Sequence, residues 1–185
     1  ILGSGGSDRN NNGGNDIEDV LKIAETHENI IAGVADDFMR PERMAVYTPE
    51  IIASYKERLH NGAKRKLDFW TVIYTHEIEA TAKPYLDVFD VISMWTWCAK
   101  DIVNLDENYK KLKKYTKEKP IMAGCYMWDY GEHKPMPMDL MKKQLDVYYN
   151  WYEQGKIAGV ILCSNCIADI GLATVDYTKE WLDQL

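Results

Sequence analysis

The chain has 185 residues, of which 46% are hydrophobic and 28% are charged, so it is long enough for a globular domain with a sizeable core. Its 29 acidic and 22 basic side chains give a net charge of −7, which argues against nucleic acid as a partner because phosphate neutralisation needs clustered Lys and Arg. No stretch approaches the roughly 20 consecutive apolar residues of a membrane-spanning helix, and we expect a soluble protein without a membrane span.

The chain opens with a segment rich in glycine and asparagine. Residues 1–2 resemble the end of a strand, and residues 3–15 predict a flexible loop, because they contain neither of the common glycine-rich phosphate-binding patterns. Asn15 or Asp16 is expected to cap a helix that continues to about Glu28. Since the chain does not begin with Met, we expect a leader or a longer upstream segment in the full protein.

Residues 31–38 predict the first complete strand. Their continuous apolar character indicates burial on both faces, as in a parallel sheet covered by helices. The run ends in two adjacent carboxylates, Asp36 and Asp37. Thr48, followed by Pro49 and Glu50, then marks the start of a helix that should end near residues 61–62 in a left-handed glycine stop.

The same alternation continues to the end of the chain. Apolar, β-prone runs that end in aromatic or polar residues are followed by amphipathic segments with the periodicity of helices. The further predicted strands are 69–75, 91–97, 121–128 and 160–163. The further predicted helices are 80–89, 105–117, 138–154 and a terminal helix capped by Thr174.

This order predicts an α/β fold with right-handed crossovers and a parallel sheet. A doubly wound sheet and a closed barrel both fit, and we expect a TIM-type β/α barrel because polar or aromatic residues follow every strand rather than one switch point. Six strands, with residues 1–2 included, are two short of eight. Residues 1–185 are therefore expected to be a single barrel domain that lacks its first two βα units, about three quarters of a full barrel. A smaller open sheet is the alternative.

In such a barrel, Asp36 and Asp37 would end the fourth strand and Asp129 the seventh. The chain thereby resembles glycoside hydrolase barrels, which carry two catalytic carboxyls at these strand ends and a rim of aromatic side chains. Its DDF and YxWDYG strand ends also resemble those of an uncharacterised bacterial barrel family. The resemblance implies a carbohydrate or another polyhydroxylated small molecule as the ligand, no cofactor, and an extracytoplasmic location if the ligand is a carbohydrate. Four/seven glycosidases usually have Glu at both positions, whereas this chain has Asp.

Glycoside cleavage needs one protonated and one ionised carboxyl. Neighbouring residues of a strand point to opposite sides, so only one of the first two carboxylates can face the barrel axis. We expect this to be Asp37, the nearer to the barrel opening, with Asp36 held by Arg40 or Arg43. Asp129 is expected to be the general acid, because its aromatic neighbours create an apolar setting that favours the protonated form.

The other strand ends are expected to bind the substrate. Six Trp and twelve Tyr against three Phe favour rings that have a polar edge, which suits a surface where apolar core meets hydroxyl groups. For Trp95 and Trp97 a sugar platform and core packing are equally consistent with the pattern. The expected substrate-binding residues are Asp36, Tyr74, His76, Glu77, Trp95, Trp97, Tyr126, Trp128 and Asn165.

Two other functions fit the same residues. A non-catalytic saccharide-binding barrel would keep the aromatic rim without a productive carboxyl pair. A metal-dependent hydrolase or lyase would use Asp36, Asp37, His76 and Glu77. The CxxC at residues 163–166 has no second CxxC to complete a zinc site, so we expect packing rather than metal or redox chemistry and no bound metal.

Overall fold

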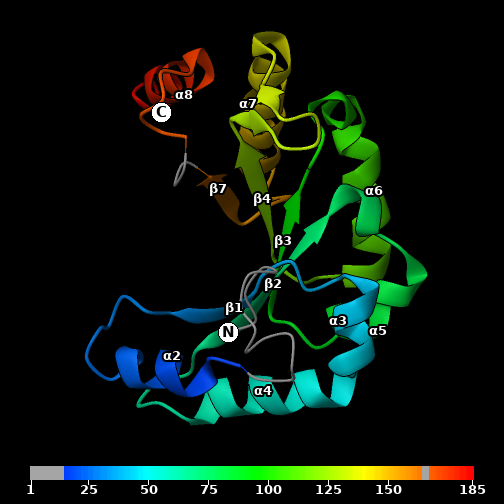
Figure 1. Cartoon of the computed structure of the whole chain (residues 1–185), viewed down its shortest axis with the longest axis vertical. Helices are drawn as coiled ribbons and strands as arrows, with labels where there is room; N and C mark the ends of the chain where they lie inside the picture. The colour runs from blue at the N-terminus through cyan, green and yellow to red at the C-terminus, as the bar shows by residue number, and fades with distance from the viewer. Residues whose placement is uncertain (1–14, 164–166) are drawn as a thin grey trace. The chain divides into compact units, whose positions relative to one another are not determined.

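A computed structural model describes residues 15–163 and 167–185 of the chain. The predicted α/β fold with a parallel sheet is confirmed, and helices alternate with the strands (Figure 1). The predicted strand at residues 1–2 and the predicted loop up to residue 14 lie outside the described residues. The main sheet has five strands: β1 (Ala32–Ala35), β2 (Asp68–Tyr74), β3 (Val91–Trp95), β4 (Ile121–Tyr126) and β7 (Gly159–Cys163).

The order of strands in the sheet is the same as their order along the chain. β1 pairs with β2 in parallel, with Ala32 opposite Asp68, and β4 pairs with β7 in parallel, with Met122 opposite Gly159. A doubly wound sheet reverses its strand order at a switch point. The described sheet has no such reversal, so its strand order is not that of a doubly wound sheet.

Helices and short 3₁₀ segments connect these strands. A short hairpin, β5 (Trp128–Asp129) with β6 (Lys134–Pro135), follows β4. The helices are α2 (Ile17–Ala24), α3 (Pro41–Val46), α4 (Pro49–Asn61), α5 (Lys83–Leu86), α6 (Leu105–Thr116), α7 (Met138–Glu153) and α8 (Ala173–Leu182), and the 3₁₀ segments are η1 (Thr75–Glu77), η2 (Ala80–Ala82) and η3 (Ala99–Asn104).

Several local predictions need correction. β1 is shorter than predicted and is covered on one face only, since Val34 is exposed whereas Ala35 is buried. The predicted helix over 80–89 is confirmed only in part: residues 80–86 are helical but are divided into η2 and α5, because Pro84 has no amide hydrogen and is tolerated only in the first turn of a helix. α3 was not predicted.

The helix ends give a mixed result. Thr48 caps α4 as predicted, because its hydroxyl accepts a hydrogen bond from the Ile51 amide at 3.5 Å. Gly62 does follow α4, but its φ of −89° is not left-handed. A Cβ on Gly62 would lie 2.7 Å from Cδ1 of Leu21, so glycine is needed here for close packing. Thr174 is not a cap: it lies inside α8, and its hydroxyl donates to the Met127 carbonyl at 2.7 Å.

The described chain divides into two compact units. The first comprises the residues up to Ile73, Glu77–Ser93 and Leu112–Pro120. Its core is built around three fully buried phenylalanines, and the ring centroids of Phe69 and Phe89 lie 4.8 Å apart. Phe38 packs edge-on against Phe89 at 5.8 Å. These rings are the only phenylalanines of the sequence, and all of them serve the apolar interior of this unit.

The second unit comprises Tyr74–His76, Met94–Lys111 and the residues from Ile121 onward. Its longest helix, α7, packs on β4 through buried side chains. The Tyr148 hydroxyl donates to the Gly124 carbonyl at 3.1 Å, and the Gln144 side-chain amide donates to the Tyr126 carbonyl at 3.0 Å. Polar atoms on a buried helix face thus reach the carbonyls of a strand, which fixes α7 against β4 more specifically than apolar contact alone.

Candidate functional site

Three consecutive strands end in an aromatic residue. Tyr74 is the last residue of β2, Trp95 of β3 and Tyr126 of β4, and all three side chains are buried. The hydroxyl oxygens of Tyr74 and Tyr126 lie 3.3 Å apart, and the Trp95 and Tyr126 ring centroids lie 4.6 Å apart. The second unit therefore brings together three of the predicted substrate-binding residues at the carboxyl ends of their strands.

Three more rings pack on this group and are accessible to solvent. His76 is exposed and stacks on Tyr74, with centroids 5.6 Å apart and an interplanar angle of 6°. Trp97 is half-buried and stacks on Tyr130 at 5.4 Å, and its edge meets the Tyr74 ring at 5.3 Å. We call Tyr74, His76, Trp95, Trp97, Tyr126 and Tyr130 the aromatic cluster. Its buried members support rings that can stack on a ligand.

Tyr130 was not among the predicted substrate-binding residues, although its ring lies 4.5 Å from that of Tyr126. The sequence did contain a signal, because Tyr130 belongs to the YxWDYG segment that follows β4. Trp97 was predicted as the last residue of the strand 91–97, but it lies beyond the end of β3. Its contacts with the cluster come from the loop after the strand, and the alternating pattern of strand residues does not describe them.

Two glycines allow this close packing. A Cβ on Gly124 would lie 1.9 Å from Cδ2 of Trp95, so the indole lies directly against the backbone of β4. A Cβ on Gly131 would lie 2.1 Å from the Cys98 sulfur, and the Gly131 amide donates to the Trp97 carbonyl at 3.0 Å. The loops after β3 and β4 are thereby held against each other, which positions Trp97 and Tyr130.

Asp129 lies in β5 and is buried, with 2% of its surface exposed. Its Oδ1 accepts a hydrogen bond from the Glu132 amide at 3.2 Å, so one oxygen stabilises the turn of the hairpin. Trp128, the residue before it, is half-buried and pairs with Pro135 of β6. Asp129 therefore stabilises the β5–β6 hairpin, and this structural role does not depend on whether Asp129 also takes part in a reaction.

Asp36 and Asp37 lie in the first unit, in a turn after β1 rather than in the strand. Asp37 has a φ of 48°, and its Oδ2 accepts a hydrogen bond from the Arg40 guanidinium at 3.3 Å. Of the two arginines expected to hold Asp36, Arg40 pairs with Asp37 instead, whereas Arg43 acts on Asp36 through its charge. Burial, and secondly the charge of Asp37, raise the pKa of Asp36. The surroundings of Asp36 thus favour its protonated form.

The remaining predicted residues are more dispersed. Glu77 is half-buried at the end of η1 and belongs to the first unit, whereas His76 belongs to the second. Asn165 and Cys166 lie outside the described residues. Asp37 and Asp129 belong to different units, so their pairing stays a prediction.

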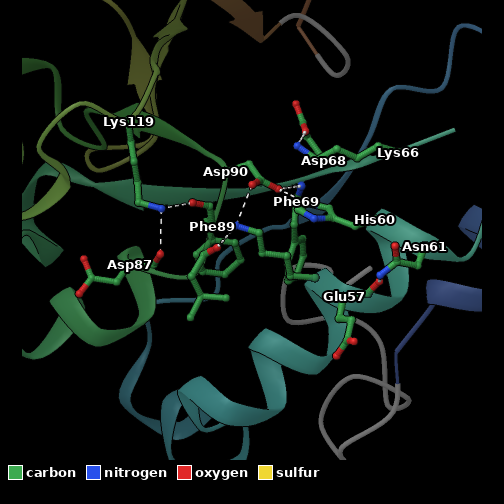
Figure 2. A network of polar contacts seen from close by, with 12 residues as sticks. Glu57, His60, Asn61, Lys66, Asp68, Phe69, Asp87, Phe89, Asp90 and Lys119 are labelled. Carbon is green, nitrogen blue, oxygen red and sulfur yellow. Dashed lines mark hydrogen bonds and ion pairs between the residues drawn. The ribbon is translucent and has the colours of Figure 1, made fainter.

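One group in the first unit has the composition of a metal site. Ligand atoms of His60, Asp68 and Asp90 all lie within 4.8 Å of one another (Figure 2). However, the Asp90 oxygens already have partners: Oδ1 is 2.7 Å from the Lys56 ammonium, and Oδ2 is 2.8 Å from His60 Nε2 and accepts from the Phe69 amide at 2.9 Å.

We interpret this group as a structural network. Asp68 begins β2, and Asp90 immediately precedes β3, so the group lies at the amino ends of these strands, away from the carboxyl ends where α/β folds bind ligands. Burial alone would raise the pKa of Asp90, but hydrogen bonds from Lys56, Phe69 and His60 outweigh it and lower the pKa to about 2. Lys119 adds hydrogen bonds to the carbonyls of Asp87 and Phe89 in the same loop (Figure 2).

Comparisons with protein-family models, with curated proteins and with solved structures give no match for this chain. Within residues 15–163 and 167–185, no helix is long and apolar enough to cross a membrane. A function is therefore inferred from the arrangement of the chain's own residues.

Proposed function

We propose that this chain is part of a carbohydrate-active β/α barrel and that the aromatic cluster is its sugar-binding surface. The proposal rests on one observation. Aromatic rings from the ends of three consecutive strands contact one another, and solvent-accessible rings pack beside them. Sugar rings present apolar C–H faces that stack on aromatic rings, while their hydroxyls bond to polar edges such as those of Tyr, Trp and His.

The order of the strands supports the same proposal. The strand order follows the chain without reversal, which is the order of a β/α barrel. In a closed barrel β1 would be the fourth strand and β4 the seventh. The residues after these strands would then occupy the positions at which glycoside hydrolase barrels carry their carboxyls.

Binding is tested by calorimetric titration of the protein with a panel of neutral and acidic oligosaccharides. Replacing Trp97 or Tyr130 with alanine should weaken binding of any oligosaccharide that binds by about tenfold, because each variant removes an accessible stacking ring. Tyr152→Ala is the matched control, since Tyr152 is an exposed aromatic residue of α7 outside the cluster. Equal affinity in all three variants would refute the role of the cluster.

Hydrolysis is the more specific proposal, with Asp37 and Asp129 as the carboxyl pair. The raised pKa of Asp36 makes Asp36 a second candidate for the proton donor. Asparagine replacements suit the test, because the side-chain amide oxygen in Asp129→Asn could still accept the bond from the Glu132 amide. Turnover of chromogenic glycosides should fall at least about a hundredfold in Asp37→Asn and Asp129→Asn while the circular dichroism spectra stay unchanged. Full turnover in both variants would exclude this pair.

A non-catalytic saccharide-binding protein is the second candidate. It is favoured by the burial of Asp129 and by the use of its Oδ1 in the hairpin turn. Binding that depends on Trp97 and Tyr130, together with no turnover of any bound oligosaccharide, would identify this function. The metal-dependent alternative would instead show as a stoichiometric metal in the purified protein.

A further inference from the structure

Arg43 is a buried cation without a hydrogen-bonding partner at its charged end. It lies in α3, and 5% of its surface is exposed. Both terminal nitrogens, Nη1 and Nη2, are covered and make no hydrogen bond within the described residues. A buried ionised group without a partner is strongly destabilising, and the great majority of buried polar groups are hydrogen-bonded. We therefore expect an anion to bind to this guanidinium.

The neighbouring carboxylates do not fill this role. Arg40, the other cation of the segment after β1, is paired with Asp37 at 3.3 Å. Asp36 is near enough for the charge of Arg43 to oppose the upward shift that burial and Asp37 impose on its pKa. Within the described residues, however, no carboxylate oxygen lies within the 4.0 Å of an ion pair with Arg43. Within the described residues, Arg40 thus has an ion-pair partner and Arg43 has none.

The location of Arg43 suits a ligand. α3 closely follows the turn after β1, so Arg43 belongs to the segment at the carboxyl end of a strand. In parallel α/β folds this is the end at which ligands bind. A guanidinium presents a planar pair of N–H donors that matches a carboxylate with two parallel hydrogen bonds.

We propose that Arg43 binds a carboxylate group of the ligand. A phosphate monoester would also fit a guanidinium, but the acidic residues of the same segment disfavour a dianion more strongly than a singly charged carboxylate. The proposed carbohydrate function, on which this step rests, makes a saccharide that contains a uronic acid the class of ligand to be tested. Because both nitrogens are covered in the structure, binding requires the groups that cover them to move.

The test compares ligands that differ only in charge. Oligomers of glucuronate, galacturonate and mannuronate are titrated beside their methyl esters, which have the same sugars without a free carboxylate. The wild type should bind one of the acid forms about tenfold or more tightly than its ester, and Arg43→Met should bind both forms with the affinity of the ester. Arg40→Met is the matched control, because Arg40 is a more exposed arginine of the same segment that already has a partner.

Stability gives an independent readout. Without ligand, Arg43→Met should have a Tm equal to or above that of the wild type, because methionine removes an uncompensated buried charge and keeps an unbranched side chain. Arg43→Lys keeps the charge but lacks the planar fork, so it should also lose the preference for the acid. A clear fall in Tm for Arg43→Met would show that a partner within the fold already satisfies Arg43 and would overturn the inference.

The remaining outcomes separate the two proposals. If the methyl esters bind as well as the acids, the carboxylate inference fails while the saccharide function stands. If succinate binds as tightly as the uronates and does so through Arg43, the carboxylate inference stands and the saccharide function fails. Inorganic phosphate that binds through Arg43 more tightly than any carboxylate would overturn the choice of anion.

Discussion

Gly124 shows how one residue can determine the arrangement of the aromatic cluster. The Trp95 indole lies where a Cβ of residue 124 would be, 1.9 Å from its Cδ2 atom. Gly124→Ala should therefore push the buried indole out of place and lower the free energy of unfolding by about 1–3 kcal/mol, the usual penalty for overpacking. Urea denaturation followed by tryptophan fluorescence measures both the stability and the altered surroundings of Trp95.

Gly159→Ala is the control for this substitution. Its added Cβ would meet Cε of Met122 at 2.9 Å, the far end of a flexible side chain that can rotate away. The loss of stability should be clearly smaller than for Gly124→Ala. Equal losses in the two variants would mean that the contact with Trp95 is not the decisive one.

At the scale of elements, α7 depends on Tyr148 for its attachment to β4. The Tyr148 side chain is fully buried, and its hydroxyl donates to the Gly124 carbonyl. Burial, and secondly the neighbouring Cys125, raise the pKa of Tyr148 well above its ordinary value near 10. The folded chain thus keeps this proton more strongly than the unfolded chain does. The contribution of the protonated Tyr148 to the free energy of unfolding is therefore fully present below pH 10 and is lost as the pH rises above 10.

Tyr148→Phe should therefore have two effects. Near pH 7 the variant should lose about 1–2 kcal/mol, because the Gly124 carbonyl loses its donor. Above about pH 10 its stability should fall less steeply than that of the wild type, because the buried group that resists ionisation is gone. Denaturation curves at several pH values measure both effects. Tyr152→Phe changes an exposed position of the same helix and should retain the wild-type dependence of stability on pH. If Tyr148→Phe also retained the wild-type dependence, this role of the Tyr148 hydroxyl would be contradicted.

At the scale of the whole molecule, charge decides which partners are excluded. The net charge is −7, and the densest basic run, residues 110–119, is mostly the exposed side of α6. Lys119 at its end is already bonded to the carbonyls of Asp87 and Phe89. In a mobility-shift experiment at about 50 mM salt we expect no binding of duplex DNA or single-stranded RNA at about 10 μM protein. Salt-dependent binding in this range would show that the basic run forms a phosphate-binding surface.

The sequence predicted the regular elements well and the irregular ones poorly. The strands that end at Tyr74, Trp95 and Tyr126 were recognised from their apolar runs, and α4 from its Thr48 cap. The role of Thr174 was misjudged, because its hydroxyl bonds to Met127, a carbonyl far away in the sequence. Residues on α7 show the same limit: Tyr148 is buried and its neighbour Tyr149 is exposed, although the two are the same type of residue in the same helix.

The candidate site was predicted only as a set of residue types at strand ends. The sequence named five members of the aromatic cluster, but it could not show that their rings meet or that Tyr130 joins them. It offered Arg40 or Arg43 as the partner of Asp36, whereas Arg40 pairs with Asp37, and it did not indicate that both terminal nitrogens of Arg43 are buried without a hydrogen bond in the described residues. These features depend on loop conformations, which no periodic pattern encodes.

The sequence by itself determined the alternation of strands and helices and the polar or aromatic end of each strand. These properties are local, since side-chain periodicity and capping involve residues a few positions apart. Only the tertiary structure decided the order of the strands, the packing of Trp95 on Gly124 and the burial of Arg43. Each of these results from contacts between residues distant in the chain, where packing and desolvation outweigh local preference.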